Sequence, residues 1–251
     1  MKPLALLTLL ILLPLSFNRA EDAKSAELQK LTGPADTLLE EGKFAQARGR
    51  FQIALTKATS LYSGTPATSA DRTWIPSIRE SIAKCEIGLK NYEAAAVLYR
   101  DAGNEYEAYY KSSTADEGRV AAGEAFSRAC WTSCLANDGA APYYGKRSLE
   151  FTPDVYWVEL NNAWADLLFG NQDKAMRVFR NNINKTIDDQ PVRKLIEDDL
   201  AALRAIDNPS PRLATLDVLL SESPASSVPA PAAPVAPATP RLPAGPSLPP
   251  G

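Results

Sequence analysis

The chain has 251 residues, a formal net charge of −3 and no histidine. Mild acidity disfavours non-specific nucleic-acid binding, which requires a basic surface that displaces counterions from the phosphates, so we expect no nucleic-acid partner. The absence of histidine removes the commonest general base, the Ser–His and Cys–His nucleophile pairs and the usual zinc ligand, so we expect neither a metal nor a cofactor.

Residues 1–20 are predicted to be a secretory signal peptide. Lys2 precedes an apolar run at positions 4–15, and the small residue Ala20 stands before an acidic pair. A basic start, a short apolar run and a small residue at the cleavage point are typical of such signals. We therefore expect an exported protein, periplasmic or extracellular, with no membrane span after cleavage. The alternative is an uncleaved signal that anchors the chain in the membrane, although the run is shorter than the roughly 20 residues of a spanning helix.

Residues 21–221 contain a short motif that recurs between helical segments. A turn residue is followed after five positions by alanine, and four positions later by an aromatic residue in each copy. The turn residue lets the chain reverse, the alanine lets two antiparallel helices cross closely, and the ring fills the gap between them. The copies are Gly42, Phe44, Ala47, Phe51 and Ala54; Tyr92, Ala95, Tyr99 and Ala102, after Lys90; and Gly170, Ala175 and Phe179.

This motif resembles the tetratricopeptide repeat family, whose consensus has Gly, an aromatic residue two positions later, then Ala, an aromatic residue and Ala. The small residue that the family has earlier, in the first helix of each pair, is present as Ala35, Ala83 and Ala163. The resemblance covers most of residues 27–187. It implies an all-α fold, a short right-handed α-solenoid of stacked antiparallel helix pairs. The alternative is an ordinary helical bundle with the same spacing by coincidence.

The copies of the motif are not evenly spaced. Ala47 and Ala95 are 48 residues apart, more than the 34 residues of the family repeat. We expect the extra length in residues 60–73, which are rich in Ser, Thr, Gly and Pro. A fourth, degenerate unit is predicted between the second and third copies, with a long helix over residues 117–137 and a second segment over residues 142–149.

Three cysteines, Cys85, Cys130 and Cys134, lie within the predicted helices. Cys130 and Cys134 are one turn apart, which places their α carbons about 6 Å apart, at the edge of disulfide geometry. Three interpretations stay open: buried packing residues, a disulfide in an oxidising compartment, or a metal or redox site. Packing is the commonest fate of a free cysteine, and a thiol pair without histidine or a second cysteine pair makes a poor zinc site.

Trp157, Asn161 and Trp164 share one face of a predicted helix. In the tetratricopeptide family the first helix of each pair lines a concave groove, so the resemblance implies that these three residues contact a partner. Aromatic side chains are common anchors of binding energy. The alternative is that the rings pack between helices.

The end of the chain divides into a cap and a tail. Residues 192–206 show helical apolar periodicity, and residues 212–220 are predicted to form a last short helix, as a solenoid requires a terminal cap. Residues 222–251 are mostly Pro, Ala and Ser, with Arg241 the one charged residue between 224 and 250. Such a segment buries too little apolar surface to fold, so we expect a disordered tail with polyproline II character.

Three carboxylate runs, at 40–41, 188–189 and 197–199, are predicted to be solvated on polar helix faces or at helix starts, where acids stabilise the helix. The sequence therefore favours a non-catalytic scaffold that binds a peptide or protein partner in the cell envelope. One alternative is a structural spacer or assembly factor that acts through the Pro-rich tail. The other is an enzyme that uses carboxylates or the Cys130/Cys134 pair.

Overall fold

The computed structural model describes residues 5–65, 70–187 and 189–222, and these are almost entirely helical. The helices are α1 (Ala5–Glu40), α2 (Phe44–Leu61), α3 (Trp74–Gly88), α4 (Tyr92–Ser113), α5 (Asp116–Leu135), α6 (Ala141–Phe151), α7 (Tyr156–Phe169), α8 (Gln172–Asn182), α9 (Val192–Arg204) and α10 (Ala214–Glu222). Two short 3-10 helices, η1 (Ala70–Thr73) and η2 (Pro211–Leu213), precede α3 and α10. The predicted helical class is confirmed for these residues.

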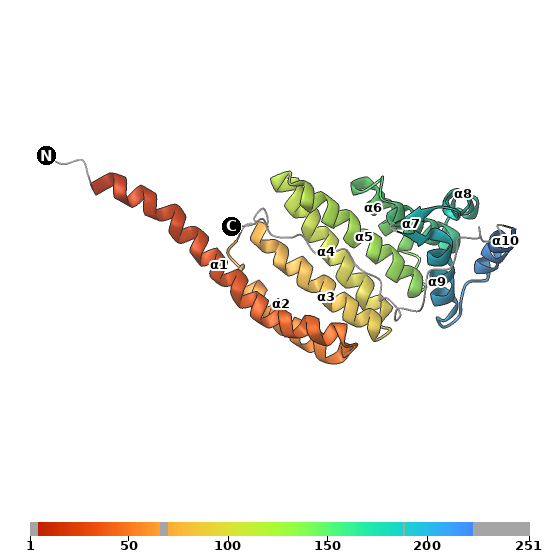
Figure 1. Cartoon of the computed structure of the whole chain (residues 1–251), viewed down its shortest axis with the longest axis horizontal. Coiled ribbons are helices and arrows are strands. Elements are labelled where there is room, and N and C mark those ends of the chain that lie inside the picture. Colours follow the sequence, from red (N-terminus) through yellow and green to blue (C-terminus); the bar gives the residue numbers. More distant parts are fainter. Residues whose placement is uncertain (1–4, 66–69, 188, 223–251) are drawn as a thin grey trace.

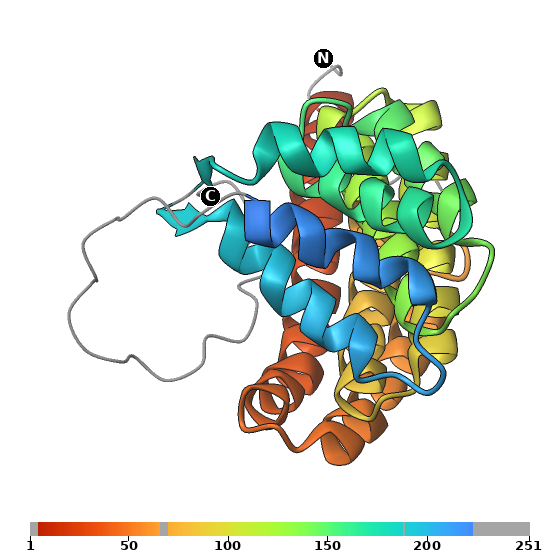
Figure 2. The ribbon, with the colours of Figure 1, turned by 90° about the vertical axis from the view of Figure 1, so that its right-hand side faces the viewer.

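Successive helices pack against one another in chain order from α1 to α8 (Figure 1). In addition, α7 contacts α5, and α9 reaches back to α5. Figure 2 looks at the C-terminal end, where α9 and α10 lie side by side in front of the earlier helices. The helices therefore form a row of adjacent pairs that is closed at one end by α9 and α10.

Three of the turns between paired helices share one backbone geometry. Gly42, Lys90 and Asn137 each have a positive φ, of 72°, 61° and 54°. The following amide, of residue 43, 91 or 138, donates to the carbonyl five residues back at 2.8 to 2.9 Å. This is the Schellman arrangement, which satisfies carbonyl groups that the helix end leaves free. The α5–α6 turn thus belongs with the first two, although its sequence lacks the predicted motif.

The predicted third turn is built differently. Gly170 has a φ of −121°, so it does not take the positive φ of the other turns, but an added Cβ would lie 2.8 Å from the side-chain oxygen of Asp166 and 3.2 Å from its α carbon. Asn171 instead caps α8, because its side-chain oxygen accepts a hydrogen bond from the backbone amide of Lys174 at 3.0 Å. The turn therefore lies where the sequence predicts it, and an asparagine cap completes it in place of a positive φ.

The recurring alanines lie where neighbouring helices cross. All six, in pairs twelve positions apart, are at most 1% exposed: Ala35 with Ala47, Ala83 with Ala95, and Ala163 with Ala175. The rings four positions after each second alanine, of Phe51, Tyr99 and Phe179, are equally buried, as are Ala54 and Ala102. Small side chains let the helix axes approach, and the rings fill the space beside each crossing.

The α5–α6 pair achieves the same close crossing with other residues. Cys130 precedes Asn137 by seven positions, as Ala35 precedes Gly42. It faces Gly145 of α6, where an added Cβ would lie 3.1 Å from the Cys130 sulfur. The small partner is therefore a glycine, three positions later than the alanine spacing predicts, because the turn before α6 is longer.

The ends of the chain complete the comparison with the sequence. Helix α1 is continuous through Ala20, so the expected cleavage point lies within a helix, and residues 1–4 of the predicted signal lie outside the described residues. No helix among the described residues is both long enough and apolar enough to cross a membrane. The predicted tail, beyond Glu222, also lies outside them. Export, cleavage and the tail's role stay predictions.

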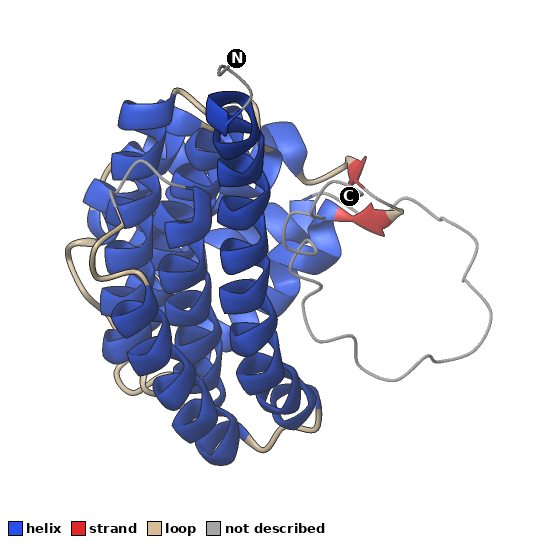
Figure 3. Ribbon diagram, turned by 90° about the vertical axis from the view of Figure 1, so that its left-hand side faces the viewer, coloured by secondary structure: helices blue, strands red, loops and turns tan. Residues whose placement is uncertain are grey.

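Two connections complete the comparison, the expected extra length between α2 and α3 and a hairpin that the sequence did not predict. Of residues 60–73, where extra length was expected, α2 takes the first two and η1 the last four, while 66–69 lie outside the described residues. A short antiparallel hairpin, β1 (Thr186–Ile187) and β2 (Gln190–Pro191), connects α8 to α9 and stands out at the edge of the helices in Figure 3. Asp189, with a φ of 62°, reverses the chain there. A hairpin of this length has no alternating pattern for the sequence to reveal.

Candidate functional site

Charged and aromatic side chains from the odd-numbered helices meet in one row. Arg128 of α5 is at its centre: one guanidinium nitrogen donates to Glu80 of α3 at 2.8 Å and another to Glu124 at 3.0 Å. The guanidinium also lies over the ring of Trp157 of α7, 5.8 Å from its centroid. We call the row the polar strip; its members are Asp36 of α1, Glu80 and Lys84 of α3, Glu124 and Arg128 of α5, and Trp157 of α7.

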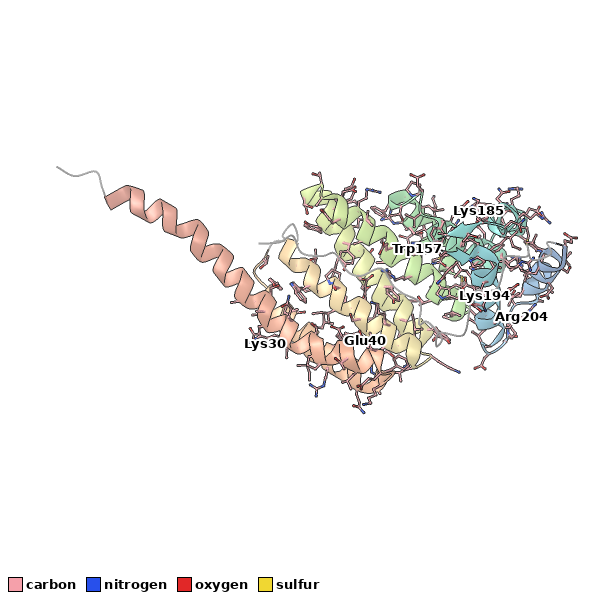
Figure 4. The ribbon with its side chains drawn as sticks, viewed as in Figure 1. Lys30, Glu40, Trp157, Lys185, Lys194 and Arg204 are labelled. Atoms are coloured by element: carbon pink, nitrogen blue, oxygen red, sulfur yellow. The ribbon has the colours of Figure 1, made fainter. Side chains whose placement is uncertain are left out.

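The strip is only partly exposed. The side chains of Arg128, Glu80 and Glu124 keep 13%, 16% and 24% of their accessible surface. Trp157 is half-buried, and Figure 4 shows it between α5 and the helices that follow. A guanidinium pressed against an aromatic face and held by two carboxylates has a fixed orientation. The contacts around Arg128 therefore join α3, α5 and α7 and hold a rigid ring at the edge of the strip.

Burial shifts the titration of the strip. It raises the pKa of Glu80, although Arg128 and Lys84 act in the opposite direction. Burial likewise lowers the pKa of Lys84, against the pull of Glu80, and raises that of Asp36, against the pull of Lys84. These mutual influences show that the charges of α1, α3 and α5 form one electrostatic system. Because opposite charges alternate along it, the strip carries no strong net sign.

The three predicted groove residues have different environments. Asn161 donates through its side-chain nitrogen to the hydroxyl of Ser127 at 3.0 Å, and its carbonyl lies 3.3 Å from the Cys130 sulfur. It therefore binds α7 to α5. Trp157 keeps part of its surface and lies in the polar strip. The structure thus brings Trp157 to the surface and assigns Asn161 a contact between helices.

Trp164 does not lie at the surface, which corrects its proposed part in a groove. Its side chain is 0% exposed. The ring packs 4.8 Å from the Phe179 centroid and 6.3 Å from that of Trp131. The indole nitrogen donates to Asp199 of α9 at 3.0 Å. Helix α9 covers the part of α7 that carries Trp164, so the ring packs between helices, the alternative that its sequence left open.

Asp199 also departs from its prediction as a solvated acid. It is half-buried against α7, and burial raises its pKa to about 7, with the Trp164 hydrogen bond acting in the opposite direction. The other described members of the three carboxylate runs are exposed or half-buried. Asp199 follows Ile196 by three positions and precedes Leu203 by four, so it lies within the buried stripe of α9. That register is the sequence signal that could have identified it.

The cysteines are buried free thiols. Burial raises the pKa of Cys85 to about 11 and that of Cys134 well above its ordinary value. Since the thiolate is the reactive form, these two are poor nucleophiles at neutral pH. Among the described residues no group of three or more Cys, Asp and Glu side chains is arranged to hold a metal ion.

A second surface feature is an open groove of about 530 Å³ between α9 and α10. Leu200 and Leu220 form its apolar part, and the Arg204–Asp217 ion pair crosses it at 2.5 Å. No catalytic arrangement converges there. The polar strip remains the stronger candidate for a functional surface.

Comparison with protein-family models, curated proteins and solved structures found no match to this chain.

Proposed function

We propose that the chain is an exported, non-catalytic scaffold of tetratricopeptide type, whose odd-numbered helices line a groove that binds a peptide or protein partner. In this proposal the helix pairs form a short right-handed α-solenoid, and the polar strip lies in the groove. The observation that carries it is the meeting of Glu80, Arg128 and Trp157, from three successive odd-numbered helices, on one partly exposed face.

The repeated packing supports the proposed architecture. Three turns have the same positive-φ geometry, and three alanine pairs with a constant spacing are buried at helix crossings. Helix α7 also contacts α5, two helices earlier in the chain. Contacts between neighbouring units of one kind are what a stacked repeat requires.

The chemistry of the strip favours binding over catalysis. Both carboxylates beside Arg128 accept hydrogen bonds from it, so neither is held free to act as a general base. A rigid, amphipathic ring such as Trp157 provides contact area with little loss of side-chain entropy. Because the strip has three acidic and two basic members, its formal net charge is only −1, and we expect a partner segment without a large net charge.

The test is affinity capture from envelope extract with the full chain as bait. Trp157→Ala should reduce the amount of captured partner by about tenfold, equivalent to about 1.4 kcal/mol, a typical loss for an aromatic anchor. Tyr143→Ala is the matched control, because Tyr143 is an aromatic residue of the even-numbered α6 and is 61% exposed. Circular dichroism establishes that both variants remain helical.

Full capture by a folded Trp157→Ala variant would remove the strip from the binding surface. Equal losses in both variants would show that the captured protein binds aromatic side chains without regard to this face. Either result would refute the proposed groove.

A further inference from the structure

We propose that helix α9 is a pH-sensitive latch over the α7 end of the odd-helix face, closed while the Asp199 carboxyl is neutral and loosened when it ionises. This inference rests on the proposed function, because it concerns how that face is uncovered. It adds a regulation that the binding proposal does not contain. The argument begins with the contact between α9 and α7.

The contact joins one carboxyl to one indole. Asp199 accepts a hydrogen bond from the Trp164 indole nitrogen at 3.0 Å, and Trp164 is fully buried. The element on the other side is α5, which presents the buried, neutral thiol of Cys134. Neither α5 nor α7 therefore brings a cation to Asp199. Among the described residues, a carboxylate at this position has one protein hydrogen-bond donor and no cation paired with it.

The charged groups on α9 itself do not stabilise an ionised Asp199. Asp198, the neighbouring acid, raises the pKa of Asp199 further by repulsion. The nearest cation along the helix, Lys194, is paired with Asp198. In the described part of the chain, no ion pair includes Asp199. Burial and the repulsion from Asp198 thus favour the protonated form of Asp199 and raise its pKa to about 7.

Other contacts also hold the C-terminal helices against the rest of the fold. Apolar side chains of α9, including Ile196 and Leu203, are buried. Beyond them, Gln172 of α8 donates to Thr215 of α10 at 2.7 Å, and Arg212 donates to the Leu167 carbonyl at 3.3 Å. These contacts anchor η2 and α10. Ionisation of Asp199 therefore weakens the middle of α9 selectively, and local opening of one element is an ordinary motion in folded proteins.

Opening would change the proposed binding face. It would expose Trp164, and with it the half-buried Trp131 that lies against it. Both rings are on α5 and α7, the same two helices that carry Arg128 and Trp157. The aromatic surface available to a partner would thus extend from the polar strip towards the C-terminal end. In the closed state α9 occupies that position.

The size of the effect follows from proton linkage. A carboxyl with a pKa of about 7 when closed and its ordinary value when open raises the opening equilibrium by at most about 30-fold between about pH 5.5 and about pH 8.5. Because Asp199 is only half-buried, solvent screening reduces this figure. We expect a rise of about tenfold.

The experiment uses the full chain and no partner. Hydrogen exchange of the α9 amides, corrected for the intrinsic pH dependence of exchange, measures the opening equilibrium at both pH values. Acrylamide quenching of tryptophan fluorescence measures the exposure of the four tryptophans together, of which opening would uncover Trp164 and Trp131. We expect both to increase at the higher pH. Asp199→Asn, which keeps an acceptor for Trp164 without a titrating proton, should remove the increase. Asp198→Asn is the control and should retain it.

Unchanged exchange of α9 between the two pH values would overturn the latch. So would the same pH response in Asp199→Asn as in the parent chain. If Asp199→Asn does not fold, fluorescence quenching of the parent chain across the pH range still decides, since a flat profile refutes the proposal. None of these readouts depends on a partner, so failure of the latch and failure of the proposed binding function are distinguishable.

Discussion

Gly145→Ala tests the close crossing of α6 with its neighbours. Gly145 is buried in the middle of α6, where α6 packs on both α5 and α7. A Cβ added there would overlap the side-chain oxygen of Asn162 and lie 3.1 Å from the Cys130 sulfur. Asn162 is only 7% exposed, so its side chain has little space in which to move. The glycine is therefore required by the crossing, although alanine is the better helix former.

Two opposing effects determine the magnitude. In a helix interior, replacing glycine by alanine stabilises the fold by about 1 kcal/mol. Forcing an extra carbon into a packed crossing destabilises it by about 1–3 kcal/mol. We therefore expect Gly145→Ala to lower the free energy of unfolding by about 1 kcal/mol. Gly49→Ala is the matched control: it lies inside α2, and a Cβ there meets no atom within 4 Å. It should raise the free energy of unfolding by about 1 kcal/mol.

Urea denaturation followed by circular dichroism at 222 nm measures both variants against the parent chain. The informative quantity is the difference between the two substitutions, about 2 kcal/mol, because the helix-propensity gain is common to both. If Gly145→Ala proved as stabilising as Gly49→Ala, the crossing would have room for a side chain. The assignment of Cys130 and Gly145 as the small residues of the α5–α6 pair would then be wrong.

Phe51→Ala should lower the free energy of unfolding by about 3–5 kcal/mol because it leaves a cavity in the core. Ile53→Ala, on the exposed side of α2, should change it by less than about 0.5 kcal/mol. Equal effects of the two substitutions in urea denaturation would contradict the packing of α2. Asp199→Asn should make the free energy of unfolding less dependent on pH. Because the pKa of Asp199 is raised in the folded state, the parent chain should lose about 2 kcal/mol, after screening, as pH rises from about 4 to about 7. Parallel pH profiles of the two chains in thermal unfolding would refute this. A chain that starts at Glu21 should keep the parent melting temperature, since contacts such as the Ser25–Trp74 hydrogen bond lie beyond the removed segment; a large drop would show that residues 1–20 belong to the fold.

The sequence predicted most of the helix pairs because their reversals depend on local chemistry. Turn residues and small residues recur at fixed spacing around Gly42, Lys90 and Gly170, so the same packing arrangement is encoded three times in the chain. The α5–α6 pair was predicted only as a degenerate unit over residues 117–137 and 142–149, because its close crossing is made by residues other than those of the motif. Asn137 takes the positive φ, a conformation that asparagine tolerates well, and a glycine replaces the second alanine. The seven-residue spacing from Cys130 to Asn137, the same as from Ala35 to Gly42, would have shown that this pair follows the same packing pattern.

The residues of the proposed binding face were harder to predict because exposure depends on elements distant in sequence. Trp157 and Trp164 are two helical turns apart and share one face of α7, and nothing local distinguishes them. Their different environments come from what lies over that face: Arg128 of α5 beside the first, and Asp199 of α9 on the second. One turn of α9 therefore decides which of the two tryptophans is accessible at the surface. Asp199 contacts Trp164 from this turn, although the charge pattern alone predicted that it would be solvated. Its position between the buried Ile196 and Leu203 shows that helical register predicts burial better than the presence of neighbouring acids does.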